Sequence, residues 1–194
     1  MHKLNTFAFC CPTQRWAVSH AAGAEPLTCP PTTYERFDPA SLRHRNLLYF
    51  SLHGIPDQPY WYGADHITAM STDAFQALDL SATVVFVANC HLPDTPFLSA
   101  ILQCEPRFLA GGQGTNFTRG QSLVGAHLLG YLFRIALSLD IAPRHAFALA
   151  KYTLTTRTQA LTNAAAREKN RARKRHLAED IAANTDALDF RSFT

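Results

Sequence analysis

Two runs of apolar residues dominate the middle of the chain. Residues 47–52 and 84–88 are almost uninterrupted hydrophobic segments of strand length, the pattern of parallel strands that are buried on both faces. His53-Gly54 follows the first run, and Asn89-Cys90 follows the second. Parallel neighbours need a right-handed crossover, and the apolar spacing of residues 68–78 predicts a helix there.

Weaker patterns predict the remaining elements. A third strand, residues 107–110, ends at the glycine cluster Gly111-Gly112-Gln113-Gly114, and residues 5–11 and 16–20 predict two short strands near the start of the chain. Residues 21–31 form a linker rich in Gly, Pro, Thr and Ala, and residues 55–63 form a loop that contains Tyr60-Trp61-Tyr62. Helices are expected at residues 39–43 after the N-cap Asp38, at 97–104, at 121–139 and from Pro143 onward.

Together these elements predict an α/β protein with a mostly parallel central sheet flanked by helices. We expect three parts: an N-terminal segment with an edge strand and a linker (1–45), a core (46–158), and a basic helical tail that frays at its end (159–194).

Composition narrows the class of protein. The 194 residues are 47% hydrophobic, enough for one domain with a real core. Five cysteines, an odd number without regular spacing, argue against a disulfide framework and for a reducing compartment. Residues 1–9 lack the apolar stretch of a signal peptide, and residues 123–139 are too short for a membrane span. We therefore expect a cytoplasmic protein without a metal site, an organic cofactor or a membrane contact.

The candidate chemistry lies where the two hydrophobic runs end. Open α/β sheets build their sites at the carboxyl ends of strands, so His53 and Cys90 are expected at one edge of the sheet. An imidazole beside a thiol lowers the pKa of the thiol and returns a proton to a leaving amine. The backbone N–H groups of Gly54 and Cys90 are suited to an oxyanion hole. Taken singly, such a histidine is usually a turn residue and such a cysteine a small buried hydrophobe.

The blocks Leu-Leu-Tyr-Phe-Ser-Leu-His-Gly and Val-Val-Phe-Val-Ala-Asn-Cys resemble the signature of the caspase-like (clan CD) cysteine peptidases. The clan contains caspases, metacaspases, gingipains, separases and CHAT domains, and the likeness is closest to the CHAT-domain and gingipain-like peptidases. Arg107-Phe-Leu-Ala-Gly-Gly and residues 146–151 resemble later blocks of the same clan. The resemblance covers roughly residues 46–154.

This resemblance implies a caspase-like three-layer sandwich, abridged at its N-terminus, with His53 as general base and acid and Cys90 as nucleophile. Metacaspases carry an aspartate two residues before the cysteine, where this chain has Ala88, so a preference for Arg or Lys is not expected. Asp57, Asp65 and Asp94 are candidate substitutes. The candidate substrate-binding residues are Gly111, Gly112, Gln113, Asn116, Asp94 and Trp61.

Three functions remain open. The first is a cysteine endopeptidase that cleaves a protein or peptide substrate and is activated by a regulatory partner. The second is an inactive caspase-like module used for interaction or scaffolding. The third is a nucleic-acid contact through the basic run, for which a solvated helix face is the alternative interpretation. The cations of that run are Arg167, Arg171, Arg173, Lys174 and Arg175.

Overall fold

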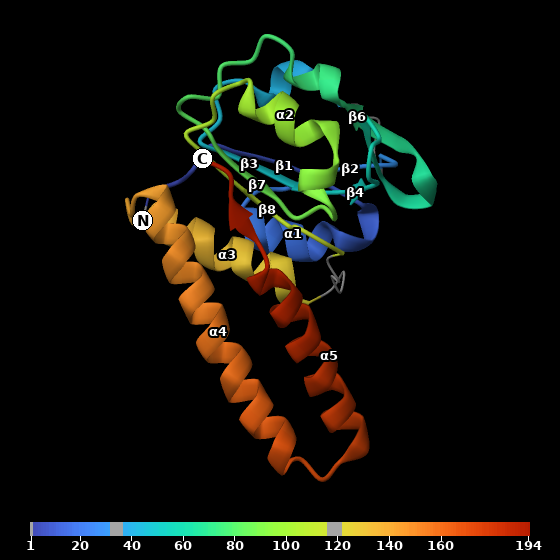
Figure 1. The fold of residues 1–194 in the computed structure, drawn as a ribbon, viewed down its shortest axis with the longest axis vertical. Coiled ribbons are helices and arrows are strands. Elements are labelled where there is room, and N and C mark those ends of the chain that lie inside the picture. Colours follow the sequence, from blue (N-terminus) through green and yellow to red (C-terminus); the bar gives the residue numbers. More distant parts are fainter. Residues whose placement is uncertain (1, 32–36, 116–121) are drawn as a thin grey trace.

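The computed structural model describes residues 2–31, 37–115 and 122–194. Six strands form one sheet in the order β2-β1-β3-β7-β8-β9 (Figure 1). The first five are parallel, whereas β9 runs antiparallel to β8, so the predicted α/β class with a mostly parallel sheet is confirmed. The strands are β1 (Thr6–Cys10), β2 (Leu27–Thr28), β3 (Leu47–Ser51), β7 (Val84–Val87), β8 (Phe108–Gly111) and β9 (Arg191–Ser192).

Helices cover both faces of this sheet (Figure 1). Side chains alternate along each strand, so Tyr49 of β3 and Phe86 of β7 face one helical layer while Phe50 and Val87 face the other. The first layer contains α1 (Arg15–Ala22), α3 (Gly125–Ser138) and the sheet-proximal parts of α4 (Pro143–Arg167) and α5 (Arg171–Leu188). The second layer contains α2 (Pro96–Leu102). Among the described residues, no helix is both long and apolar enough to cross a membrane.

The connection from β3 to β7 differs from the predicted helix at residues 68–78. A small antiparallel sheet of β4 (His53–Gly54), β5 (Tyr60–Tyr62) and β6 (Thr68–Ser71) takes its place, followed by a 3-10 turn at Thr72–Phe75. The prediction was wrong because the apolar residues of this segment suit either state. Met70 pairs across the ladder with Trp61, and both side chains are buried beneath α2.

The N-terminal region also needs one correction. Residues 16–20, predicted as a strand, lie in α1, which ends at Gly23 in the left-handed conformation (φ 68°) that glycine adopts readily. The expected strand at residues 5–11 is confirmed as β1. The short helix after Asp38 is confirmed as the 3-10 helix Pro39–Leu42, with the Ala40 N–H donating to Asp38 Oδ1 at 2.9 Å.

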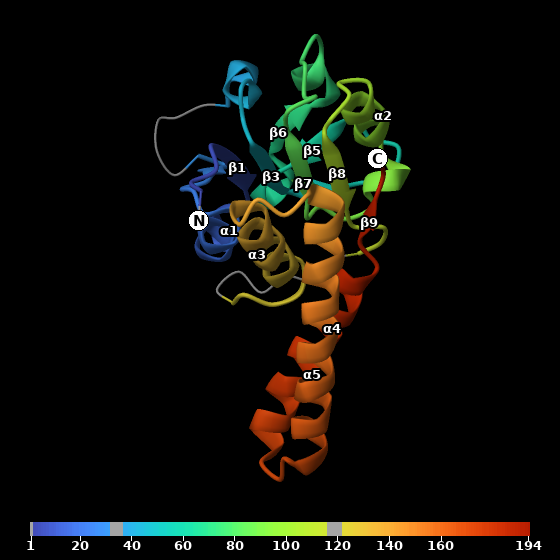
Figure 2. The same cartoon turned by 90° about the vertical axis from the view of Figure 1, so that its left-hand side faces the viewer.

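The C-terminal region is more ordered than predicted. Helix α4 runs through residue 158, the predicted domain boundary, and α5 returns antiparallel to it (Figure 2). The prediction that the chain frays at its end is wrong, because Phe190 is fully buried and stacks on Phe86 with 5.6 Å between ring centroids. Beyond it, β9 pairs with β8, and the Phe193 N–H donates to the Leu109 carbonyl at 2.9 Å. Such long-range contacts leave no periodic signal in the sequence.

Candidate functional site

The two candidate catalytic residues follow the ends of β3 and β7, which are neighbours in the sheet. The ladder pairs Leu47 with Val84 and continues to Phe50 and Val87. Two residues beyond this pair, the Leu52 N–H donates to the side-chain oxygen of Asn89 at 2.7 Å, inside the protein. His53 and Cys90 are the next residues of the two segments, and His53 itself pairs with Tyr62 in the small antiparallel sheet. The two central strands therefore bring the predicted pair to one edge of the sheet.

Gly54 lies very close to the backbone of Cys90. A Cβ atom at position 54 would lie 2.3 Å from the backbone carbonyl oxygen of Cys90, far inside van der Waals contact. Glycine is thus required by the proximity of the Cys90 backbone, and the two residues proposed for the oxyanion hole touch each other.

Replacing Gly54 by alanine is expected to lower the free energy of unfolding by about 1–3 kcal/mol, because the added methyl group must displace the Cys90 backbone. The same displacement should slow alkylation of Cys90. Gly114→Ala is the matched control, since a Cβ there meets no atom within 4 Å and the φ angle is not positive. Urea unfolding curves for both variants measure the difference. Equal free energies of unfolding for the two variants would mean that the Cys90 backbone moves away from the added methyl group without an energetic cost.

The imidazole of His53 is biased toward its neutral form. Its side chain is exposed at the surface, yet surrounding protein atoms displace enough water to lower its pKa, and nearby His66 lowers it further. The small antiparallel sheet brings His53 near His66, because His53 pairs with Tyr62 and the ring centroid of Tyr62 lies 6.3 Å from that of His66. A neutral imidazole is the form that accepts a proton from a thiol.

Cys90 differs from the other four cysteines in its surroundings. Its side chain is half-buried, whereas Cys10, Cys11, Cys29 and Cys104 are buried. Burial raises the pKa of each of these four thiols, that of Cys11 to about 11, which keeps them protonated and unreactive at neutral pH. All five cysteines lie within the described ranges, and no disulfide joins them.

The glycine turn after β8 is bound to the residues that follow Cys90. The N–H groups of His91 and Leu92 donate to the carbonyls of Gly114 and Gly112 at 3.1 and 3.2 Å. Gly111 belongs to β8 rather than to the turn, and a Cβ there would lie 2.5 Å from Leu92 Cδ2. Gly111 and Gly112 are buried and Gln113 is partly exposed, so Gln113 offers the more accessible surface beside the pair. Asn116, the other predicted groove residue, lies outside the described residues.

His91 is not among the candidate site residues predicted from the sequence. Its ring lies between two side chains, with Nδ1 3.4 Å from Asp94 Oδ2 and Nε2 3.3 Å from Thr115 Oγ1. The backbone of His91 is left-handed (φ 55°), an uncommon conformation for a residue with a Cβ. The signal was present as a histidine directly after the cysteine, with an aspartate three residues later.

Asp94 and Trp61 were both predicted to contact substrate. The carboxylate of Asp94 faces His91, and its backbone carbonyl accepts the Asp57 N–H at 2.8 Å, so its substrate role stays a prediction. Trp61 must be corrected. It is fully buried in β5, and its ring stacks on Phe97 of α2 at 3.9 Å between centroids. The aromatic cluster is part of a strand, so the ring of Trp61 belongs to the core.

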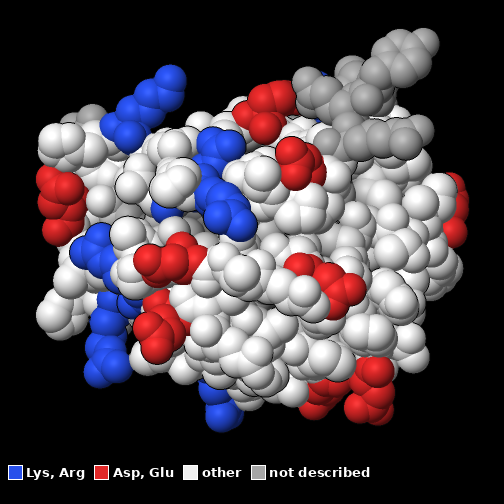
Figure 3. Space-filling view, turned by 90° about the horizontal axis from the view of Figure 1, so that it is seen from above, with Lys and Arg blue, Asp and Glu red and all other residues white. Residues whose placement is uncertain are grey.

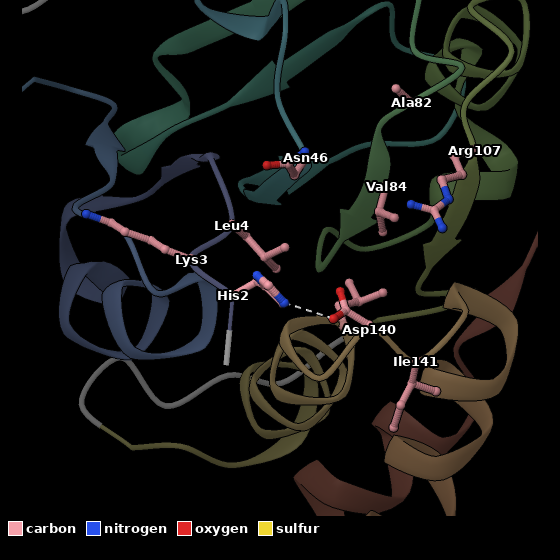
Figure 4. A pocket seen from close by; sticks show the side chains of 10 residues that line it. His2, Lys3, Leu4, Asn46, Ala82, Val84, Arg107, Asp140 and Ile141 are labelled. Carbon is pink, nitrogen blue, oxygen red and sulfur yellow. Dashed lines mark ion pairs between the residues drawn. The ribbon is translucent and has the colours of Figure 1, made fainter.

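A separate polar pocket of about 370 Å³ lies at the opposite edge of the sheet, beside the amino ends of β1, β3, β7 and β8 (Figure 4). His2 Nε2 and Asp140 Oδ2 face each other there at 3.0 Å, and Asn46 and Arg107 also line the pocket. This pocket was not predicted from the sequence. Within the described ranges, no group of three or more His, Cys, Asp or Glu side chains could hold a metal ion.

Comparison of the chain with protein-family models, with curated proteins and with solved structures finds no match. The functional proposal below therefore depends on the geometry of the site and on the resemblance of its two sequence blocks.

Proposed function

We propose that this protein is a cysteine endopeptidase of the CHAT and caspase-like type, with Cys90 as nucleophile and His53 as general base and acid. The observation that supports the proposal is the close approach of the two strand ends at the carboxyl edge of the sheet: the Leu52 N–H donates to Asn89 Oδ1, and a Cβ at Gly54 would lie 2.3 Å from the Cys90 carbonyl oxygen. That edge is where open α/β sheets hold their reactive groups.

The fold offers further support for a caspase-like three-layer sandwich. Helices lie on both faces of a mostly parallel sheet, and the strand order β2-β1-β3 puts two strands before the histidine. The outer one, β2, has only two residues, in keeping with an abridged N-terminal part. A small antiparallel sheet begins at His53 itself and leads toward β7.

The reaction starts with transfer of the Cys90 proton to the neutral imidazole of His53. The thiolate then attacks the carbonyl carbon of a substrate peptide bond, and the N–H groups of Gly54 and Cys90 stabilise the oxyanion. The His53 imidazolium gives its proton to the leaving amine, which departs and leaves an acyl-thioester on Cys90. Water, deprotonated by His53, hydrolyses the thioester and regenerates the thiol.

Alkylation by iodoacetamide tests this function without knowledge of the substrate or of an activating partner. The expected result is that Cys90 is modified at neutral pH at least about tenfold faster than N-acetylcysteine in the same tube, because a neighbouring imidazole accepts the thiol proton. Cys90→Ser should remove this fast modification and also any cleavage of a peptide library. A Cys90 that reacts no faster than N-acetylcysteine would favour the inactive interaction module instead.

A further inference from the structure

Residues 167–176 form the far end of a long helical hairpin, here called the hairpin tip. Helix α4 has 25 residues and α5 has 18, and the two pack against each other in antiparallel fashion. At 1.5 Å per residue, α4 is about 37 Å long. Its first part packs on the sheet through Phe147 and Leu154, and the rest projects away from the body with the tip as its most distant point (Figures 1 and 2). The tip is therefore open to a bulky partner.

Positive charge is concentrated at the hairpin tip. Six of the 18 Lys and Arg residues of the chain lie in these ten positions, with Glu168 as the only acidic residue. All six cations are exposed. Arg175 pairs with Glu179 at 3.0 Å and Arg173 lies 3.9 Å from Glu168, but Lys169, Arg171 and Lys174 form no ion pair with any described residue.

Helix stability does not explain where these cations lie. The N-terminus of a helix carries partial positive charge, so cations in the first turn are unfavourable. The first turn of α5 nevertheless contains Arg171, Arg173 and Lys174 and no acidic residue, and its N-cap is Asn170, whose side-chain oxygen accepts from the N–H groups of Ala172 and Arg173. The repulsion is relieved when an anion binds, because the helix N-terminus and the side chains then act together.

The end of the molecule remote from the tip shows no comparable concentration of cations among its described residues. Figure 3 views the end of the molecule remote from the tip, where Lys, Arg, Asp and Glu are interspersed around a broad uncharged area. The stem of the hairpin is also different. Between residues 154 and 166 of α4 the only charged residue is Arg157, and residues 177–188 of α5 contain three acidic residues and no Lys or Arg. Within the hairpin, positive charge is therefore concentrated at the tip.

We infer that the hairpin tip binds the phosphodiester backbone of double-stranded nucleic acid. A duplex presents closely spaced phosphates to a projecting group of cations. Single strands are held mainly by stacking on aromatic side chains, and residues 159–180 contain no Phe, Tyr or Trp. Membrane-surface helices insert large apolar side chains, whereas Leu177 and Ile181 are partly buried and the exposed apolar residues there are alanines. The expected contact is electrostatic and independent of base sequence.

Fluorescence anisotropy with a labelled 20-base-pair duplex tests this inference on the full chain. Binding should weaken steeply between 50 and 200 mM salt. The triple variant Lys169→Gln, Arg171→Gln, Lys174→Gln breaks no ion pair among the described residues, and each phosphate contact that it removes should lower the slope of log affinity against log salt by about 0.9. We expect the slope to fall by about 2 to 3 and the affinity at 50 mM salt to fall at least about tenfold.

The triple variant Arg43→Gln, Arg107→Gln, Arg157→Gln is the matched control, because it removes the same charge from exposed sites outside the tip. Equal losses of affinity in the two triple variants would show a general charge effect and overturn the inference.

Duplex DNA and duplex RNA are tested separately, and binding of either duplex supports the inference. Stronger binding to polyglutamate, to a single strand, or to phosphatidylcholine vesicles with phosphatidylserine than to both duplexes would overturn it. Cys90→Ser should bind as the unchanged protein does, which separates this outcome from that of the peptidase proposal.

Discussion

Replacing His53 by alanine is expected to reduce peptide cleavage by about 10²- to 10⁴-fold, the usual contribution of a positioned general base and acid. Alkylation of Cys90 at neutral pH should also slow by about tenfold or more, because a thiol with an ordinary pKa is only a few per cent ionised there. Both rates are measured on the folded variant, with circular dichroism as the check of structure.

His91→Ala is the discriminating companion to this experiment. His91 directly follows Cys90 and its ring is held between Asp94 and Thr115, so it is the other imidazole that could serve the thiol. If His53 is the base, His91→Ala should change the alkylation rate much less than His53→Ala does. The reverse order of effects would assign the base to His91 and remove His53 from the mechanism.

The dependence of the cleavage rate on pH gives an independent test of His53. Its pKa is lowered by the loss of surrounding water and by His66, so the neutral base persists further into mild acid than an ordinary imidazole. His66→Ala removes the charged neighbour and should raise the pKa of His53. The acid limb of the cleavage profile would then move to higher pH, while the cleavage rate on the plateau would stay the same.

A second large effect is expected on stability rather than on activity. His127 of α3 is fully buried, its Nδ1 lies 3.0 Å from the Tyr49 hydroxyl, and burial lowers its pKa from 6.5 to about 4. The unfolded chain binds this proton more readily than the folded one. The neutral His127 therefore favours folding fully above pH 6.5, and this contribution is lost as pH falls through 6.5 toward 4. The two pKa values correspond to about 3 kcal/mol.

Urea unfolding of wild type and His127→Gln at pH 7.0, 5.5 and 4.5 measures this contribution. Carboxylates titrate equally in both proteins, so the difference between the two pH profiles isolates the histidine. We expect the wild type to lose about 2 to 3 kcal/mol more than the variant across this range. If the free energies of unfolding of the two proteins changed equally with pH, His127 would be protonated inside the folded protein, and a neighbouring group would have rearranged to accept a hydrogen bond from it.

The central strands could be predicted because strands that are buried on both faces have continuous apolar sequences. β3, β7 and β8 coincide with the predicted hydrophobic segments, and the parallel pairing of β3 with β7 agrees with that pattern. The same reasoning placed His53 and Cys90 at strand ends. It misassigned residues 16–20 and 68–78, where short apolar spacings suit helix, strand or 3-10 turn and only the neighbouring elements choose among them.

Within the site, local sequence could not reveal contacts between distant segments. The need for Gly54 comes from the Cys90 carbonyl, and the position of the glycine turn comes from its hydrogen bonds to His91 and Leu92. Trp61 was predicted to contact substrate because aromatic residues in loops often do, yet packing against Met70 and Phe97 buries it completely. No periodicity within residues 55–63 distinguishes these outcomes.

The sequence alone determined the α/β class, the central strands, the chemistry available at their ends, and the concentration of cations at residues 167–176, because these depend on local hydrophobicity and charge. Only the tertiary structure decided which residues meet. The β3–β7 register beside Cys90, the burial of Trp61 and Phe190, and the projection of the hairpin tip all depend on packing between segments far apart in the chain. Such packing is set by the shape of the whole core.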